Sequence, residues 1–182
     1  MQVRAAAAED LPAIQAIYAH HVLNGLASFE EAPPTTDELR RRFNDVIGKG
    51  LPWLVADFGG VVGGYGYCAP YRTRSAYRYA LEDSVYVRED FQGRGVGAAL
   101  LESLIERCTG LGYRQMIAVI GDSAHAASIN LHASCGFVRV GTLRSVGFKF
   151  GRWVDSVLMQ RPLGNGDGSK PVKAGDGSPP ET

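Results

Sequence analysis

SVYVREDFQGRGVGAA, the stretch from Ser84 to Ala99, decides how the rest of the chain is interpreted. A β-prone apolar run leads into a short polar loop, and Gly93, Gly95 and Gly97 then open an amphipathic helix. Glycines let backbone N–H groups approach an anion closely, and the start of a helix supplies unpaired donors and partial positive charge. The stretch therefore predicts a pyrophosphate site between a strand and a helix, with a simple tight turn as the alternative.

The spacing of these glycines excludes two common nucleotide sites. A dinucleotide-binding turn needs G-x-G-x-x-G, whereas residues 93–97 read G-x-G-x-G. A P-loop needs G-K followed by Ser or Thr, and no such sequence follows here. The anion is therefore expected to belong to another kind of ligand.

Strands and helices alternate on both sides of this stretch. Two apolar runs, 53–56 and 61–69, are joined by DFGG and predict a hairpin. Asp10 and Thr35 stand where helix caps are expected. The other expected strands cover 3–5, 84–87, 115–120, 137–143 and 154–163, and the expected helices 11–22, 36–47, 96–108 and 125–135. This order predicts an α/β fold with a mixed sheet whose parallel pairing lies in its second half.

Composition limits the class of protein. The 182 residues carry 19 Lys plus Arg and 19 Asp plus Glu, and this balance argues against a nucleic-acid or anionic-membrane binder. Three cysteines without a C-x-x-C pair argue against a disulfide framework or a zinc site, and we expect no metal. The start of the chain lacks the apolar core of a signal peptide, so we expect a cytoplasmic protein. We expect one domain over residues 2–163 and a disordered tail over 164–182.

The glycine loop also fits Q/R-x-x-G-x-G/A, with Gln92, Gly95 and Gly97 at the specified places. Five more stretches are similar, in order, to one group of proteins: LASFEEAPPT (26–35), APYRTRSAYRYALEDSVYV (69–87), AVIGDS (118–123), INLHASCGF (129–137) and GFKFGRWVDSVLMQ (147–160). The chain thus resembles, over about residues 2–161, the phosphinothricin and methionine sulfoximine N-acetyltransferases of the GNAT superfamily. The resemblance implies a strongly bent mixed sheet flanked by helices, with acetyl-CoA in a cleft between splayed central parallel strands.

The resemblance also implies which residues hold the coenzyme. The backbone of Val85, Tyr86 and Val87 is expected to pair with the pantetheine arm as an added strand does. The residues expected at the pyrophosphate are Gln92, Gly93, Arg94, Gly95, Val96, Gly97 and Ala98. His125 replaces an Asn that is usual at this place in the family.

Two residues are candidates for the chemistry. Acetyl transfer from a thioester to an amine needs a base for the ammonium and an acid for the departing thiolate. Glu82, expected just before the strand into the glycine loop, matches the family's catalytic glutamate, and Asp83 is the competing carboxylate. His132 stands in the I-x-L-H pattern of this group, either as the acid or as a buried structural histidine.

The substrate is expected at two segments. PYRTRSAYRY (70–79) offers Arg72, Arg74 and Tyr77 to a small anionic amino acid, because guanidinium groups pair bidentately with carboxylate or phosphinate. Its alternative is an RNA-binding patch, which the neutral total charge disfavours. Phe29 and Glu30 match a family loop that closes over the substrate.

These features together predict an acetyl-CoA-dependent N-acetyltransferase that acts on the α-amine of a small anionic amino acid. The leading candidates are phosphinothricin, methionine sulfoximine and methionine sulfone. The alternatives are acetylation of a protein N-terminus and a coenzyme A sensor without turnover. We expect a homodimer, and Phe148, Lys149 and Trp153 serve either its interface or the packing of the last strands.

Overall fold

The computed structural model describes residues 1–171. Within them the chain forms one seven-stranded sheet in the order β1-β2-β3-β4-β5-β7-β6. The strands are β1 (Gln2–Ala5), β2 (Trp53–Asp57), β3 (Val62–Pro70), β4 (Ala80–Val87), β5 (Gln115–Gly121), β6 (Val138–Lys149) and β7 (Arg152–Pro162). The α-helices are α1 (Leu11–Asn24), α2 (Thr36–Gly48), α3 (Val96–Gly110) and α4 (Ala126–Ser134). Of the described strand pairs only β4 and β5 run parallel, so the predicted mixed α/β fold is confirmed.

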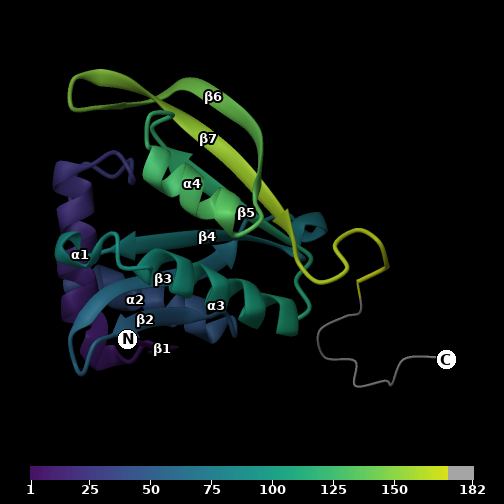
Figure 1. Ribbon diagram of the computed structural model, residues 1–182, viewed down its shortest axis with the longest axis horizontal. Helices are drawn as coiled ribbons and strands as arrows, with labels where there is room; N and C mark the ends of the chain where they lie inside the picture. Colours follow the sequence, from purple (N-terminus) through teal and green to yellow (C-terminus); the bar gives the residue numbers. More distant parts are fainter. Residues whose placement is uncertain (172–182) are drawn as a thin grey trace.

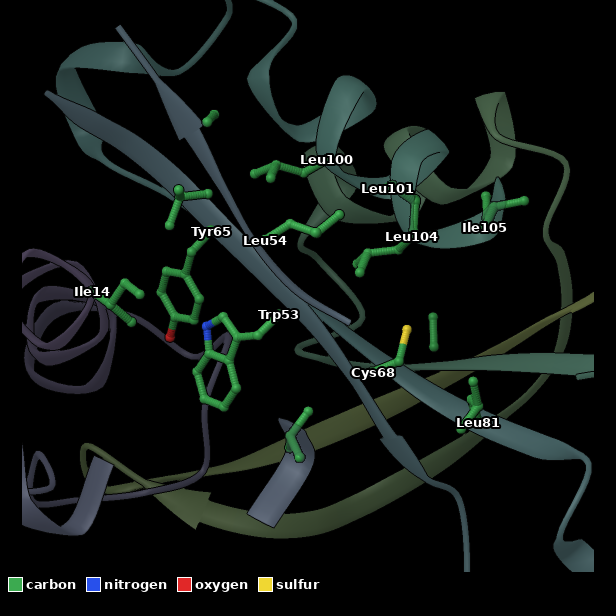
Figure 2. Packing of buried hydrophobic residues seen from close by; sticks show 14 of the residues in the cluster. Ile14, Trp53, Leu54, Tyr65, Cys68, Leu81, Leu100, Leu101, Leu104 and Ile105 are labelled. Atoms are coloured by element: carbon green, nitrogen blue, oxygen red, sulfur yellow. The ribbon is translucent and has the colours of Figure 1, made fainter. Parts of the chain in front are cut away.

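Alternation along the central strands divides the core into two layers. Figure 2 shows Leu54 pointing to Leu100 of α3, while its neighbour Trp53 points with Tyr65 to the opposite face, where Ile14 of α1 lies. Successive side chains of a strand point to opposite faces, so a run of buried apolar residues fills both layers. The pairs α1 and α2 on one side and α3 and α4 on the other thus enclose the sheet (Figure 1).

The hairpin predicted from DFGG is present between β2 and β3. Gly59 and Gly60 have φ angles of 70° and 92°, which favour glycine, and the Gly60 N–H donates to the Asp57 carboxylate over 2.6 Å. The predicted cap of α2 is also confirmed, because Thr35 Oγ1 accepts the Glu38 N–H at 3.2 Å.

The predicted cap of α1 was wrong. Asp10 ends a short 3₁₀ turn, Ala8–Asp10, and has helical backbone angles, so its side chain turns back instead of capping the helix. Its carboxylate accepts the Ala7 N–H at 2.8 Å and pairs with the Arg4 guanidinium at 2.7 Å. The residue therefore ties β1 to the start of α1.

Three strand boundaries differ from expectation. β4 begins at Ala80, four residues before the expected start. β6 continues to Lys149 instead of ending at 143, and β7 begins at Arg152 instead of 154, so the two strands form a long hairpin. The extra residues of β6 include Arg144, Ser145 and Gly147, which weaken an apolar pattern. β6 is an edge strand with many exposed side chains, so pairing with β7 rather than burial stabilises it.

Part of the predicted disordered tail lies within the described residues. Residues 164–171 contain turns in which Gly166 and Gly168 donate N–H bonds to Leu163 and Asn165. Arg114, the residue before β5, also donates a hydrogen bond to Ser169 Oγ at 2.8 Å. Residues 172–182 lie outside the described part. None of the helices in residues 1–171 is long and apolar enough to cross a membrane.

Candidate functional site

A cleft opens where β4 and β5 stop pairing. Their register ends at Asp83 opposite Ala118, and the strands then diverge toward their carboxyl ends (Figure 1). The cavity between them has a volume of about 390 Å³. Its walls are Ser84–Val87, Ala118–Gly121, the start of α3, and one side of α4 from Ala127 to His132. A crevice at the carboxyl ends of parallel strands is a frequent ligand site.

The edge of β4 that faces this cleft has backbone groups without a β5 partner. Ser84–Val87 pair with β3 on their other side, up to Gly64 opposite Val87. His21 of α1 reaches the cleft and its Nε2 donates to the Val87 carbonyl over 2.9 Å. Burial lowers the pKa of His21, the bond to Val87 opposes this, and the charges of His20 and His125 lower it further. His21 is a cleft residue that the sequence analysis missed.

The glycine loop forms the other end of the cleft. Gly95 has a φ of 77° and precedes the first turn of α3, where the N–H groups of Val96, Gly97 and Ala98 come before the first helical bond, from Ala99 to Gly95. A Cβ on Gly95 would meet no atom within 4 Å, so the space beside it is open to a ligand. These residues form the kind of anion cradle that a helix start provides.

Most of the residues expected at the coenzyme line this cleft. They are Val85, Tyr86, Val87, Gln92, Gly93, Gly95, Val96, Gly97 and Ala98. Arg94 lies beside the cleft, with its guanidinium 5.2 Å above the ring of Phe91. His125 lines the cleft as the exposed residue before α4.

Glu82 and Asp83 lie on opposite faces of β4. The sequence placed Glu82 before the strand, but it is the third residue of β4, paired with Ala69 of β3 and Ile117 of β5. Adjacent strand residues point in opposite directions, so Glu82 shares the α1 and α2 side with Tyr86, and Asp83 points toward α4. Burial and the charge of Asp83 raise the pKa of Glu82, and the charge of Arg72 opposes them.

Asp83 contacts His132 of α4. Nε2 of His132 lies 3.0 Å from Asp83 Oδ2, and the two side chains are only 6% and 1% exposed. His132 Nδ1 lies 2.7 Å from the Ser128 carbonyl oxygen. Burial lowers the pKa of His132, but the hydrogen bond and charge of Asp83 and the Ser128 carbonyl together raise it above its ordinary value. Both residues line the cleft.

Polar and aromatic groups gather on the Glu82 side of the sheet. Glu30 accepts hydrogen bonds from Arg42 of α2 at 2.6 Å and from the Tyr18 hydroxyl at 3.0 Å. The Tyr18 ring stands edge-on to that of Tyr86 at 5.0 Å. Burial is the largest of the influences that raise the pKa of Tyr18 to about 12, which keeps its hydroxyl protonated as a donor. Arg42 and Tyr18 are a second group that the sequence analysis missed.

The loop before Glu30 is fixed to two other strands. The Phe29 ring lies against Gly121 of β5 and Gly147 of β6, where an added Cβ would come within 3.0 Å and 2.5 Å of it. Lys149 of β6, which is 2% exposed, donates to the carbonyls of Gly25 and Ser28. Burial lowers the pKa of Lys149, and Glu31 and Glu30 oppose this.

The arginine-rich segment lies on the surface between β3 and β4. The guanidinium of Arg72 is 4.4 Å above the ring of Tyr71, and its charge acts on Glu82. Arg74 is exposed where a 3₁₀ turn, Ser75–Tyr77, begins, and the Tyr77 ring is edge-on to that of Tyr71 at 5.8 Å. Arg72 is thus within electrostatic reach of Glu82, and the Tyr77 ring packs against the Tyr71 ring on which Arg72 stacks.

Within residues 1–171, no group of three His, Cys, Asp or Glu side chains is arranged to hold a metal ion. The three cysteines, Cys68, Cys108 and Cys135, are buried free thiols.

Comparison with known proteins identifies the family. Residues 15–137 match the acetyltransferase (GNAT) family. The chain is 59% identical to phosphinothricin N-acetyltransferase of Alcaligenes faecalis, over 93% of this chain and 86% of that protein. It is 42% identical to the L-methionine sulfoximine/L-methionine sulfone acetyltransferase of Pseudomonas aeruginosa, over 88% and 94%. The crystal structure of a phosphinothricin acetyltransferase from Sinorhizobium meliloti in complex with AcCoA superposes with a TM-score of 0.92 at 48% identity, covering 94% of this chain and 93% of that one. The chain belongs to the GNAT family of acetyltransferases.

Proposed function

We propose that the protein transfers the acetyl group of acetyl-CoA to the α-amine of a small anionic amino acid of the phosphinothricin, methionine sulfoximine or methionine sulfone type. The observation that carries this proposal is the position of Glu82 and Asp83. They are adjacent residues at the point where β4 and β5 separate, and they point to opposite faces. Glu82, the proposed base, and His132, the proposed acid that Asp83 contacts, thus lie on opposite faces of β4, and such a pair suits the transfer of an acyl group between two substrates.

The cleft fits acetyl-CoA in three respects. The edge of β4 at Val85–Val87 has no β5 partner and can pair with the amides of an extended arm, next to the bond from His21 to the Val87 carbonyl. The open space beside Gly95 and the unpaired N–H groups of α3 suit a pyrophosphate. The cavity of about 390 Å³ lies between these two features. Bound there, acetyl-CoA would supply a thioester whose acetyl carbon accepts the amine.

Glu82 is proposed as the base. A substrate ammonium is unreactive, so it must lose a proton, directly or through water, to the carboxylate. Burial and Asp83 raise the pKa of Glu82 above its ordinary value, and a higher pKa makes the carboxylate a stronger base. His132 is proposed as the acid for the thiolate, because it lines the cleft on the other face of β4.

The acceptor is proposed to bind on the Glu82 side. Arg72 and Arg74 would pair with its carboxylate or phosphinate, and Tyr77, Phe29 and Glu30 would surround the rest. The charge of Arg72 already acts on Glu82, which supports a shared site. The names of two relatives, phosphinothricin N-acetyltransferase and methionine sulfoximine/sulfone acetyltransferase, support this substrate class.

The deciding experiment is a substrate screen with purified protein. Acetyl-CoA is mixed with phosphinothricin, methionine sulfoximine, methionine sulfone, the protein amino acids and a peptide with a free N-terminus, and free thiol is measured. The proposal expects kcat/KM to be highest for the anionic amino acids. A preference for the peptide would favour an N-terminal acetyltransferase, and coenzyme binding without thiol release would favour a sensor.

The protein is proposed to act in the cytoplasm, because its free buried thiols suit a reducing compartment.

The protein is also proposed to form a homodimer. Large apolar side chains are exposed along the β6–β7 hairpin: Val138, Val140, Leu143, Val146, Phe148, Phe150 and Trp153. Such a surface suits a second copy of the chain. Sedimentation equilibrium of the wild type and of Trp153→Glu tests it, with a dimer expected only in the first.

A further inference from the structure

The pairing of β4 with β3 shows where the backbone groups at the end of β4 point. The Arg88 N–H donates to the Gly63 carbonyl at 3.0 Å, so Arg88 directs its backbone groups toward β3. In antiparallel strands, pairs of residues that exchange both hydrogen bonds alternate with pairs that exchange none. Val85 and Val87 therefore direct their N–H and C=O groups away from β3 and into the cleft, where β5 has diverged.

His21 of α1 takes one of these backbone groups. A carbonyl oxygen only accepts, so the Nε2 atom, 2.9 Å from the Val87 oxygen, carries a hydrogen. Burial and the charges of His20 and His125 hold the pKa of His21 below its ordinary value, although the bond to Val87 opposes them. The ring is therefore neutral near neutral pH, and it offers a hydrogen bond but no charge to the cleft.

The same ring fixes the end of β4. It lies 5.5 Å from the Tyr86 ring, and it lines a second cavity of about 420 Å³ as well as the cleft. Because the ring borders two cavities, packing surrounds it incompletely, and the bond to Val87 helps to hold it. The Val87 side chain in turn lies 3.7 Å from the position that a Cβ on Gly97 would take. His21 thus connects α1, the last residue of β4 and the start of α3.

We propose that His21 is a positioning residue for acetyl-CoA, which holds the Val87 carbonyl and so presents the Val87 N–H and the Val85 carbonyl to the coenzyme arm in one register. This inference rests on the proposed function, in which the arm pairs with the edge of β4. The arm contains amides whose N–H groups need an acceptor, and a strand edge supplies one. With the Val87 carbonyl taken, the acceptor on this edge is the Val85 carbonyl. An edge that is held in place before binding costs less free energy to order.

The test measures by calorimetry how tightly purified variants bind three ligands. Acetyl-CoA and coenzyme A carry the arm, whereas the nucleotide half of the coenzyme, an adenosine diphosphate with its ribose phosphate, lacks it. His21→Phe keeps a ring against Tyr86 but has no donor for Val87. We expect this variant to raise the Kd of both arm-bearing ligands about 3- to 10-fold, the effect of losing roughly one hydrogen bond. The Kd of the nucleotide half should not change, because a neutral ring gives no charge to the phosphates.

Three further variants make the comparison decisive. His21→Gln should bind both arm-bearing ligands as the wild type does, because its amide places an N–H donor near the position of the imidazole Nε2. His21→Leu lacks both ring and donor, and it should reproduce the loss even if His21→Phe does not fold. His20→Phe is the matched control, since His20 is 45% exposed and its Nε2 lies 3.7 Å from Glu89. It should change none of the three affinities.

Several results would overturn the inference. An equal loss for the nucleotide half would assign His21 to the phosphates or to the fold. Unchanged or tighter binding of acetyl-CoA by His21→Phe would mean that the arm does not need the bond or displaces it. A loss in His21→Gln as large as in His21→Phe would show that the donor is not what matters.

The binding measurements need no amino-acid substrate, so the two proposals can fail separately. A wild type that binds acetyl-CoA but acetylates none of the candidate substrates would refute the proposed function, while the role of His21 is still measured. A wild type that binds neither arm-bearing ligand would overturn both.

Discussion

Nζ of Lys149 lies 2.7 Å from the Ser28 carbonyl oxygen and 2.9 Å from that of Gly25, which joins the end of β6 to the loop after α1. That loop carries Phe29 and Glu30, two of the proposed substrate residues. Burying an ammonium group costs free energy unless the group is hydrogen-bonded, and these two bonds offset that cost for Lys149. Lys149 is thus a structural support for the loop that carries these two proposed substrate residues.

Lys149→Met should loosen this loop. The change removes the charge and leaves two carbonyls without their donor, so we expect a loss of about 1–3 kcal/mol in unfolding free energy. The KM for the amino acid should rise more than the KM for acetyl-CoA, because the loop carries two of the residues proposed to bind the amino acid. Denaturant unfolding and steady-state kinetics measure these effects. Lys49→Met is the matched control, since Lys49 pairs only with the exposed Asp45 over 2.5 Å. Equal changes in the two KM values would contradict a role in holding the acceptor loop.

Glu82→Gln should remove the base at constant volume. We expect kcat at neutral pH to fall by roughly 10²- to 10⁴-fold. In the wild type, kcat should rise as pH increases through the pKa of Glu82, which burial and Asp83 hold above the ordinary carboxyl value. The variant should lack this limb, and its deficit should shrink at high pH as free amine becomes available. Glu89→Gln, at a side chain that is 77% exposed, is the control. Parent rates in Glu82→Gln from pH 6 to 9 would assign the base elsewhere.

Patterns local in sequence predicted much of this site. The glycine loop, the helix with Leu100 and Leu104, and the Thr35 cap all follow from residues within one or two turns. Glu82 was proposed as the base from the sequence, but the strand predicted over 84–87 left both Glu82 and Asp83 outside it, so their opposite directions were not predicted. The pairing of Asp83 with His132, 49 residues away, depends on how β4 meets α4.

Other residues could not be recognised for the same reason. Lys149 acts on carbonyls 121 and 124 residues earlier, and a lysine in a strand ordinarily faces water. His21 looks like one polar residue among the apolar positions of α1, and its bond to Val87 joins segments 66 residues apart. The chemistry of such residues is set by partners that only the fold brings near.

Gly95→Val should weaken acetyl-CoA binding while the fold persists. The φ of 77° is unfavourable for valine by about 1–2 kcal/mol, and the new side chain would occupy the open space beside the N–H groups of α3. Losing one charge-assisted bond to a phosphate, worth roughly 1.5–3 kcal/mol, would raise Kd about 10- to 150-fold. Gly59→Val is the matched control, with a φ of 70° and equally open space in the β2–β3 turn. Calorimetry on both folded variants checks this, and equal affinities would remove the loop from the coenzyme site.

Arg72→Ala should weaken recognition of the acidic end of the substrate and also change the base. A guanidinium that holds a carboxylate or phosphinate contributes roughly 1.5–3 kcal/mol, so kcat/KM for methionine sulfone and phosphinothricin should fall about 10- to 150-fold, mainly through KM. The positive charge of Arg72 lowers the pKa of Glu82, so its removal should raise that pKa and move the acid limb of the profile to higher pH.

The comparison includes two more arginines of the segment and an uncharged amine as acceptor. Arg74→Ala should share the loss on anionic substrates without the shift of the acid limb, because the charge that acts on Glu82 is that of Arg72. Arg78, whose guanidinium donates to the Ser75 carbonyl at 3.1 Å and stacks on Tyr79, is the control and should change neither. Coenzyme affinity should hold in all three variants, since the glycine loop lies elsewhere. If Arg72→Ala lost as much activity on the uncharged amine as on methionine sulfone, the arginine would serve the fold or the coenzyme, and the substrate class would lose its main support in this chain.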